Sequence, residues 1–260
     1  MSSPTRSPLH PIARRKLIFG GVAAAATVGG LAVADRMAKR YGLIPPDDGG
    51  VYGPGETLTY ACQRLLTVRK PAREFPRSMI SKNPFANAVA PPNDAFKKFQ
   101  SNGFKDWRLV VDGTVARPLS LSLSDLKMLP ARSQITEVAC EEGWSYIAEW
   151  IGTPLGEVLR EAGVLPQSRY VVYTSIEEGE WSSIDMNDAW DPHTLLTMGM
   201  NDGDLPVPFG GPLRLRLPRQ LGYKSVKYVN RLTMTDDIKK FGKGLGGVDP
   251  EFGYAWYAGI

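Results

Sequence analysis

The residue best placed for chemistry in this chain is Cys140. It follows a strand-like segment, residues 134–139, and Gly143 indicates a turn directly after it. Side chains in such turns project from rigid structure, which suits binding and catalysis. A thiolate is a soft ligand for zinc, copper, iron–sulfur centres and, by the same reasoning, molybdenum. One cysteine cannot build a tetrahedral site alone. Cys140 could therefore complete a site whose other sulfur ligands arrive with a cofactor, act as a nucleophile, or be a small buried hydrophobe.

The other cysteine and the two histidines limit these alternatives. Cys62 is the second cysteine, so a single disulfide is open to the chain, although Cys62 is most simply a buried thiol. His10 lies near the N-terminus, and His193 is the second histidine, which excludes a multi-histidine zinc or iron site. A hydrolase that pairs Cys140 with His193 stays open. It requires their side chains within about 3 Å of each other.

The elements around Cys140 are predicted to be strands and short helices. Residues 134–139 are predicted to form a strand that ends at the cysteine. A helix is predicted from Thr153 to about Gly163, with Thr153 as its N-cap and Pro154 in its first turn. Residues 169–175 are β-branched and aromatic, which favours a strand.

The remaining predicted elements are also short. Residues 107–115 alternate in polarity and turn at Asp112-Gly113, which predicts a β-hairpin. Further predictions are a helix over 120–129 capped by Ser122 or Ser124, a helical turn over 185–190, a helix starting at 191–193, and strands over 213–217 and 225–235. Residues 241–260 are rich in glycine and aromatics, and we expect an ordered tail without regular structure.

This order of elements favours an α+β fold with mixed sheets, because strands and helices do not alternate regularly as in a doubly wound sheet. No Gly-x-Gly-x-x-Gly segment directly follows a predicted strand and no Walker sequence occurs, so nucleotide binding of those kinds is unsupported. Residues 35–57 are rich in glycine, proline and charge and are predicted to be a linker. Residues 58–260 are expected to form one domain.

The first 34 residues are typical of an export signal. Arg14 and Arg15 precede an uncharged run, residues 17–34, which ends in the cleavage-site pattern Ala32-Val33-Ala34. Paired arginines at this place are typical of twin-arginine signals, whose machinery exports folded proteins that often carry a cofactor. We therefore expect a periplasmic protein, tethered to the membrane if the 18-residue run is retained, since that length is near the minimum for spanning a bilayer.

The positive net charge of +4 comes from this segment. Residues 1–34 hold four basic and no acidic residues, which leaves 27 of each in the rest of the chain. Nothing in this balance predicts nucleic-acid binding.

Several short motifs follow one another along the middle of the chain. They are Cys140 with Gly143-Trp144-Ser145, and the segments 150–155, 169–172, 192–196, 210–214 and 222–227. In this order they resemble the cofactor domain of the sulfite oxidase family, which includes the catalytic subunit of the exported methionine sulfoxide reductase. The resemblance covers about residues 105–236, half of the chain. Each motif is weak by itself, and their shared order makes the resemblance specific.

The resemblance implies a molybdenum–molybdopterin cofactor, whose dithiolene holds the metal by two sulfurs while the protein adds one thiolate. Cys140 stands at the place of that metal ligand and catalytic residue. Four further residues match positions that hold the cofactor and its phosphate, and Ser175 stands at a cofactor-contacting threonine of the reductase. The four are Arg214, Ser225, Val226 and Lys227, where the arginine offers a bidentate fork and the lysine a point charge. Trp181 falls where the family places an aromatic residue of the substrate pocket.

The sequence also departs from the family pattern. Phe209 stands where relatives carry an asparagine or histidine that contacts the cofactor. The reductase's amino-terminal cofactor loop has no clear match, and the candidates for its role are Arg64, Arg69, Arg73 and Asn83. The carboxy-terminal dimerisation domain of sulfite oxidases has no counterpart here, so a monomer is expected.

The family chemistry is oxo transfer at molybdenum, and reduction of S- or N-oxides such as methionine sulfoxide is expected. The alternative direction is sulfite oxidation, which would need several pocket arginines for a dianion. An external carrier, such as a membrane haem protein or cytochrome, is expected as electron partner, because no haem-attachment Cys-x-x-Cys-His is present. A metal-free exported binding protein and the Cys140–His193 hydrolase are the alternatives from other classes.

Overall fold

A computed structural model describes residues 43–47, 50–67, 70–87 and 93–260. The chain divides into two compact units, residues 1–44 and 45–260, and the fold below is that of the second. The predicted signal peptide and most of the predicted linker before residue 50 lie outside the described residues. Within the described residues, no helix has the length and apolar character needed to cross a bilayer.

The first sheet is mixed and has the strand order β2-β1-β10-β5-β6. Its strands are β1 (Leu109–Gly113), β2 (Leu119–Leu121), β5 (Tyr170–Ser175), β6 (Trp181–Asp185) and β10 (Val229–Thr235). β1 and β10 pair in parallel, and the other neighbours are antiparallel. The sheet therefore joins the predicted 107–115 hairpin to strands that come more than fifty residues later in the sequence.

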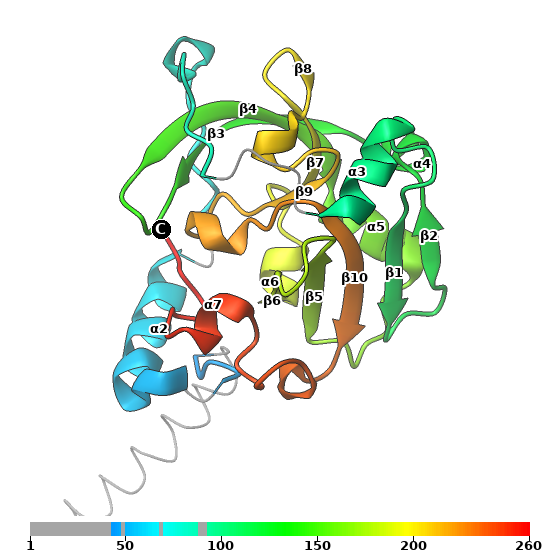
Figure 1. The fold of residues 1–260 in the computed structure, drawn as a ribbon. Coiled ribbons are helices and arrows are strands. Elements are labelled where there is room, and N and C mark those ends of the chain that lie inside the picture. The colour runs from blue at the N-terminus through cyan, green and yellow to red at the C-terminus, as the bar shows by residue number, and fades with distance from the viewer. Residues whose placement is uncertain (1–42, 48–49, 68–69, 88–92) are drawn as a thin grey trace, which may run out of the picture. The chain divides into compact units, whose positions relative to one another are not determined.

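The second sheet is antiparallel, with the order β3-β4-β7-β8 and β9 paired to β7. Its strands are β3 (Arg132–Ala139), β4 (Ser145–Pro154), β7 (Leu195–Met200), β8 (Gly203–Asp204) and β9 (Arg214–Arg216). Figure 1 shows the long β3–β4 hairpin arching over the shorter β7 and β9, while β8 lies above the hairpin in this view. Cys140 follows β3 at the tip of this hairpin.

Short helices connect and cover the sheets. The α-helices are α2 (Pro54–Thr67), α3 (Asp94–Ser101), α4 (Leu123–Met128), α5 (Leu155–Ala162), α6 (Met186–Ala189) and α7 (Val248–Glu251). The 3-10 turns are η1 (Gly50–Tyr52), η2 (Arg77–Met79), η3 (Val207–Phe209), η4 (Gly222–Lys224) and η5 (Ile238–Lys240). The predicted α+β class is confirmed, and Ser122 caps α4 through a reciprocal bond with Asp125 as its sequence indicates.

One buried core cluster joins the two sheets. It contains fully buried side chains of α5, β1, β7, β9 and β10, including Leu159, Leu109, Leu196, Leu215 and Leu232. Gly113, at the end of β1, lies directly against the backbone of β10. Its φ is 84°, and a Cβ there would meet the Met234 carbonyl oxygen at 2.0 Å. Only glycine permits this approach of β1 to β10, which is why Gly113 ends the strand and the turn follows it.

Some local predictions were wrong. Thr153 does not cap α5: Pro154 is the cap residue, and the Thr153 hydroxyl donates to the Leu126 carbonyl at 3.0 Å instead. No helix starts at residues 191–193, because the Asp191 carboxylate accepts from the His193 N–H at 2.8 Å in a turn that leads into β7. α7 lies in the tail predicted to lack regular structure, and α2 begins at Pro54, inside the predicted linker.

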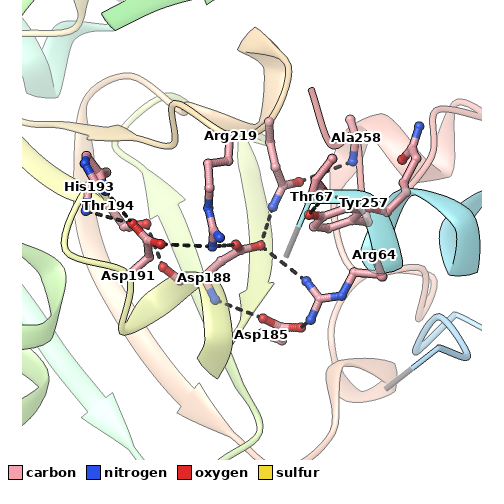
Figure 2. Close-up of polar contacts among 12 residues, drawn as sticks. Arg64, Thr67, Asp185, Asp188, Asp191, His193, Thr194, Arg219, Tyr257 and Ala258 are labelled. Atoms are coloured by element: carbon pink, nitrogen blue, oxygen red, sulfur yellow. Dashed lines mark hydrogen bonds and ion pairs between the residues drawn. The ribbon is translucent and has the colours of Figure 1, made fainter. Parts of the chain in front are cut away.

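A buried ion-pair network centred on Asp188 ties distant segments together (Figure 2). Its carboxylate accepts hydrogen bonds from Arg219 and, at 2.6 Å, from the Gln220 amide. The Arg64 guanidinium lies 3.7 Å away and also pairs with Asp185. Arg64 belongs to α2, Asp188 to α6, and Arg219 and Gln220 to the segment after β9, so the network fixes α2 and this segment on the core.

We expect Asp188→Ala to lower the free energy of unfolding by about 3–5 kcal/mol, because Arg64 and Arg219 would stay buried without their shared carboxylate. Asp202→Ala is the matched control: Asp202 is 89 % exposed in its pair with Arg77, and such solvent-exposed pairs contribute little to stability. Urea denaturation of the full chain measures both. Equal stability of the two variants would show that the network does not hold the fold.

Candidate active site

A pocket of about 330 Å³ opens beside Cys140. Its lining brings together residues of five separate parts of the chain: the segment before α3, the β3–β4 turn, the β5–β6 turn, the segment from β9 to β10, and α7. The lining residues are Asn87, Cys140, Glu141, Glu142, Trp144, Glu177, Glu180, Arg214, Gly222, Tyr223, Ser225, Val226, Lys227 and Asp249. Five of the seven predicted site residues are therefore in one cavity.

The hairpin turn holds Cys140 in place. The Cys140 N–H donates to the Trp144 carbonyl at 2.9 Å, and the Gly143 N–H donates to the Cys140 carbonyl at 3.1 Å. The Cys140 Sγ lies 3.2 Å from Glu141 Oε2 and 3.9 Å from Glu142 Oε2. Burial, together with these two carboxylates, raises the pKa of the Cys140 thiol to about 12. A metal that binds this sulfur must therefore displace a proton.

Arg214 is held by backbone carbonyls. Its Nε donates to the Ser225 carbonyl at 2.9 Å and its Nη1 to the Phe209 carbonyl at 3.2 Å. The guanidinium also lies over the Trp150 ring, 5.7 Å from its centroid. Two carbonyls and an aromatic face fix its direction without neutralising its charge.

Gly210 keeps the space beside Arg214 open for Lys227. A Cβ at residue 210 would meet the Cβ atoms of both Arg214 and Lys227 at 3.1 Å, and its φ of 106° favours glycine. Burial lowers the pKa of Lys227, and the nearby charge of Arg214 lowers it further, to about 8. A pair of like charges held together in a cavity favours an anionic ligand.

Arg216 adds a third, fully buried cation behind the pocket. Its guanidinium lies over the same Trp150 ring at 5.5 Å and donates to the Glu137 carbonyl, and its Nε has no hydrogen-bond partner in the described residues. Burial and the charge of Arg214 lower its pKa. Within the described part of the chain, neither Arg214 nor Arg216 forms an ion pair with a carboxylate. The sequence reasoning missed Arg216, although its alternation with Arg214 on one short strand was visible.

Ser225 and Val226 complete this basic part of the lining. The Ser225 hydroxyl accepts from the Leu217 N–H at 3.1 Å and lies 3.4 Å from Arg216 Nη1. Ser175 does not line the pocket: its hydroxyl accepts from the Glu177 N–H at 2.9 Å, and it supports the β5–β6 turn. Its predicted contact with the cofactor stays a prediction.

Trp181 is the second predicted site residue that does not line the pocket. It starts β6 and packs against Phe241, with ring centroids 6.3 Å apart, beside a second hydrophobic cluster. Its sequence neighbourhood indicated a pocket aromatic, but the side chain of a strand residue points to one face only, and this one faces Phe241. In the described lining, the aromatic residues are Trp144 and Tyr223.

The three described candidates for the amino-terminal cofactor loop, Arg64, Arg73 and Asn83, do not line the pocket either. Arg64 is buried in the Asp188 network, Arg73 lies over the Phe75 ring, and Asn83 is exposed. Arg69 lies outside the described residues. Asn87 lines the pocket instead. The segment before it is bound to the β3–β4 hairpin by backbone hydrogen bonds, such as that from the Ser81 N–H to the Ile147 carbonyl at 2.9 Å.

Phe209, the departure from the family pattern, does not line the pocket. Its ring meets Tyr146 edge-on, with centroids 5.8 Å apart, in the cluster under β4. Its carbonyl still fixes Arg214. The position therefore supports the basic part of the pocket through the backbone.

The geometry does not support the Cys140–His193 hydrolase. His193 is 9 % exposed, its Nδ1 lies 3.1 Å from Asp191 and its Nε2 3.0 Å from Arg132. Its Nε2 also lies 3.4 Å from Glu74 Oε1, so both ring nitrogens are engaged by residues other than Cys140. No hydrogen bond among the described residues joins it to Cys140. Cys62 is exposed on α2, so the prediction of a buried thiol was wrong, and both cysteines are free.

Comparison with known proteins identifies the family. A family model described as the oxidoreductase molybdopterin binding domain matches residues 97–241. The chain belongs to this family. The predicted family, cofactor class and fold are thereby confirmed.

Individual relatives agree with this assignment. A putative protein-methionine-sulfoxide reductase subunit YedZ1 of Azospira oryzae is 34 % identical over 71 % of this chain and 66 % of its own length. The protein-methionine-sulfoxide reductase catalytic subunit MsrP of Xanthomonas campestris pv. campestris is 30 % identical over 86 % of this chain and 70 % of its own. The chain thus spans about two thirds of these relatives.

A solved structure shares the fold. The sulfane dehydrogenase SoxCD of Paracoccus pantotrophus superposes with a TM-score of 0.50 at 26 % identity, over 51 % of this chain and 39 % of its own. The same fold therefore occurs in a protein that is named for a different reaction of sulfur compounds.

The residues present fit a molybdopterin cofactor. The pocket holds one thiol at Cys140 and, in the same cavity, Arg214 and Lys227, backed by the buried Arg216 whose Nε lacks a partner in the described residues. This donor set matches a ligand with a soft metal and a terminal phosphate dianion. In the described part of the chain, no cluster of three His, Cys, Asp or Glu residues could hold a metal, so further metal ligands would have to come with the cofactor.

The low pKa of Lys227 predicts pH-dependent anion binding. With a pKa of about 8, most of its charge is present at pH 7 and little at pH 9, so a dianion that needs the cation should bind about tenfold more weakly at pH 9. We expect this for sulfate, a stable dianion, added to cofactor-free full chain in calorimetric titrations at constant ionic strength.

Lys227→Arg is the control, since an arginine stays protonated across this range. We expect its sulfate affinity to be nearly constant between pH 7 and 9. An equally steep pH dependence in this variant would assign the effect to another group.

Proposed function

We propose that this chain is the catalytic part of a molybdopterin-dependent reductase that removes oxygen from sulfoxides or N-oxides, methionine sulfoxide among them. The observation that carries this proposal is the shared cavity of Cys140, Arg214 and Lys227. The net reaction is R₂S=O + 2 H⁺ + 2 e⁻ → R₂S + H₂O. The bound cofactor supplies the two-electron oxo-transfer chemistry.

The residues of the chain bind and orient. The Cys140 sulfur would be the protein ligand to the metal, placed by the turn bonds to Gly143 and Trp144. Arg214 and Lys227 would hold the phosphate, with the Ser225–Val226 segment between them and the buried Arg216 behind. Because carbonyls and Trp150 already fix the guanidiniums, little side-chain freedom is lost on binding.

The reducing direction is favoured over sulfite oxidation by the charges near Cys140. A sulfite dianion needs free cations in its pocket, whereas Arg64 is engaged by Asp185 and Asp188, and Glu141 and Glu142 lie beside the sulfur. The two sequence relatives are named for methionine sulfoxide reduction.

The electrons would come from an external carrier, such as a membrane haem protein or a cytochrome. Both sequence relatives are named as subunits, which supports a separate partner. The paired Arg14 and Arg15 support export to the periplasm by the twin-arginine machinery, and a retained residue 17–34 segment would tether the protein to the membrane.

Protein purified from molybdate-fed cells should contain about one molybdenum atom per chain and reduce methionine sulfoxide with an artificial electron donor. Cys140→Ala should abolish this activity and most of the bound metal, because it removes the protein's metal ligand. Metal analysis and dye-linked assays with methionine sulfoxide and with sulfite measure these outcomes.

Cys62→Ala is the matched control, since Cys62 is exposed on α2, and we expect it to keep metal and activity. A preparation free of molybdenum and indifferent to Cys140→Ala would refute the proposal. Turnover of sulfite alone would reverse its direction.

Export can be tested separately. Replacing both Arg14 and Arg15 by lysine should leave folded protein in the cytoplasm, because the twin-arginine machinery reads the arginine pair. Cell fractionation measures this, with Arg6→Lys as the control. Periplasmic protein in the double variant would argue for another route.

A further inference from the structure

The part of the pocket nearest Cys140 is acidic. Glu141 and Glu142 follow the cysteine directly, and their carboxylates approach its sulfur at 3.2 and 3.9 Å. Glu142 is fixed there by the Trp144 indole, which donates to its Oε2 at 2.7 Å. Carboxylates therefore occupy the surroundings of the sulfur that would hold the metal.

A second acidic segment reaches the same cavity from the β5–β6 turn. Glu177 and Glu180 line the pocket. The turn is held by the bonds of Ser175, whose N–H donates to the Glu180 carbonyl at 2.9 Å and whose hydroxyl accepts from the Glu177 N–H. Asp249 of α7 is a fifth carboxylate in the lining.

The described basic side chains do not pair with the four glutamates of this lining, whereas the charge of Lys224 acts on Asp249. Among residues that the structure describes, Glu141, Glu142, Glu177 and Glu180 form no ion pairs, although Glu177 lies near enough to Lys227 to influence its pKa. The lining cations, Arg214 and Lys227, are the ones that the cofactor phosphate would use. Once a dianion binds them, the remaining charge of the cavity is negative.

We propose that this acidic lining selects the substrate: the pocket takes a sulfoxide carried by a cationic molecule, such as methionine sulfoxide between lysines or arginines in a protein, and rejects anions. This inference rests on the proposed function and names the substrate class of the same site. The sulfoxide itself is neutral, so the selection acts on its neighbours through electrostatic attraction at the pocket mouth.

Three capped peptides with one methionine sulfoxide between two lysines, two glutamines or two glutamates test the proposal. With holoenzyme and one electron donor at fixed concentration, kcat/KM should fall from the lysine to the glutamate peptide by about tenfold or more at low salt. The difference should shrink at 0.3 M salt, because exposed charges are screened.

The double variant Glu141→Gln/Glu142→Gln should lose most of this preference, and Glu177→Gln part of it. Glu178→Gln is the matched control, since Glu178 is exposed on the same turn and does not line the pocket; it should keep the wild-type ratio. Molybdenum content is measured in every variant. Loss of metal in the glutamine variants would show that the glutamates hold the cofactor, which overturns the proposal.

A binding measurement separates this proposal from the proposed function. The same peptides with methionine in place of its sulfoxide are products that need no turnover, and calorimetry with the holoenzyme should rank lysine above glutamine above glutamate. Absence of turnover with all three sulfoxides would refute the proposed function. Equal binding and equal turnover of the three peptides would refute the acidic selection and leave the reductase assignment standing.

Discussion

The placement of α2 and of the segment after β9 depends on the buried Asp188 carboxylate. Asp188 lies 1 % exposed at the end of the first sheet and is approached by Arg64, Arg219 and Gln220. These partners come from segments 124 residues before it and about 30 residues after it. A buried carboxylate with several directional donors tolerates few arrangements of those segments. The network therefore specifies one relative placement of α2 and the segment after β9.

The Asp188 network is connected to the pocket lining by a short stretch of chain. Arg219 and Gln220 are followed by η4 and then by Ser225, Val226 and Lys227, which line the cavity. A second set of bonds holds the same stretch from the first sheet: the Tyr173 hydroxyl donates to the Lys224 carbonyl at 2.8 Å, and the buried Lys224 ammonium donates to the Ser183 carbonyl at 2.8 Å. The basic part of the pocket is thus anchored on both sides by buried polar contacts.

The sequence was informative where a local pattern carried the chemistry and uninformative where a distant partner decided it. Cys140, Arg214, Ser225, Val226 and Lys227 sit in turns and strand ends whose glycines and spacing fix their direction, and the structure brings these five into one cavity. Trp181, Arg64 and His193 were ambiguous because each is decided by a contact far along the chain, with Phe241, Asp185 and Arg132 respectively. Thr153 was predicted to cap a helix, but its hydroxyl donates to the carbonyl of Leu126, which lies 27 residues earlier in the chain.

Charge shows why composition could not predict the pocket's preference. A sequence pI near 9 suggests attraction to anions, yet the excess of basic residues lies in the first 34, outside the domain. In the rest of the chain the numbers of basic and acidic residues are equal. The charge of the pocket is therefore set by where the fold places individual residues. Arg214, on a buried strand, would face the cofactor's phosphate, while the glutamates on two exposed turns would face the entering substrate. Screening weakens the second set more than the first, so salt should alter substrate choice before it alters cofactor retention.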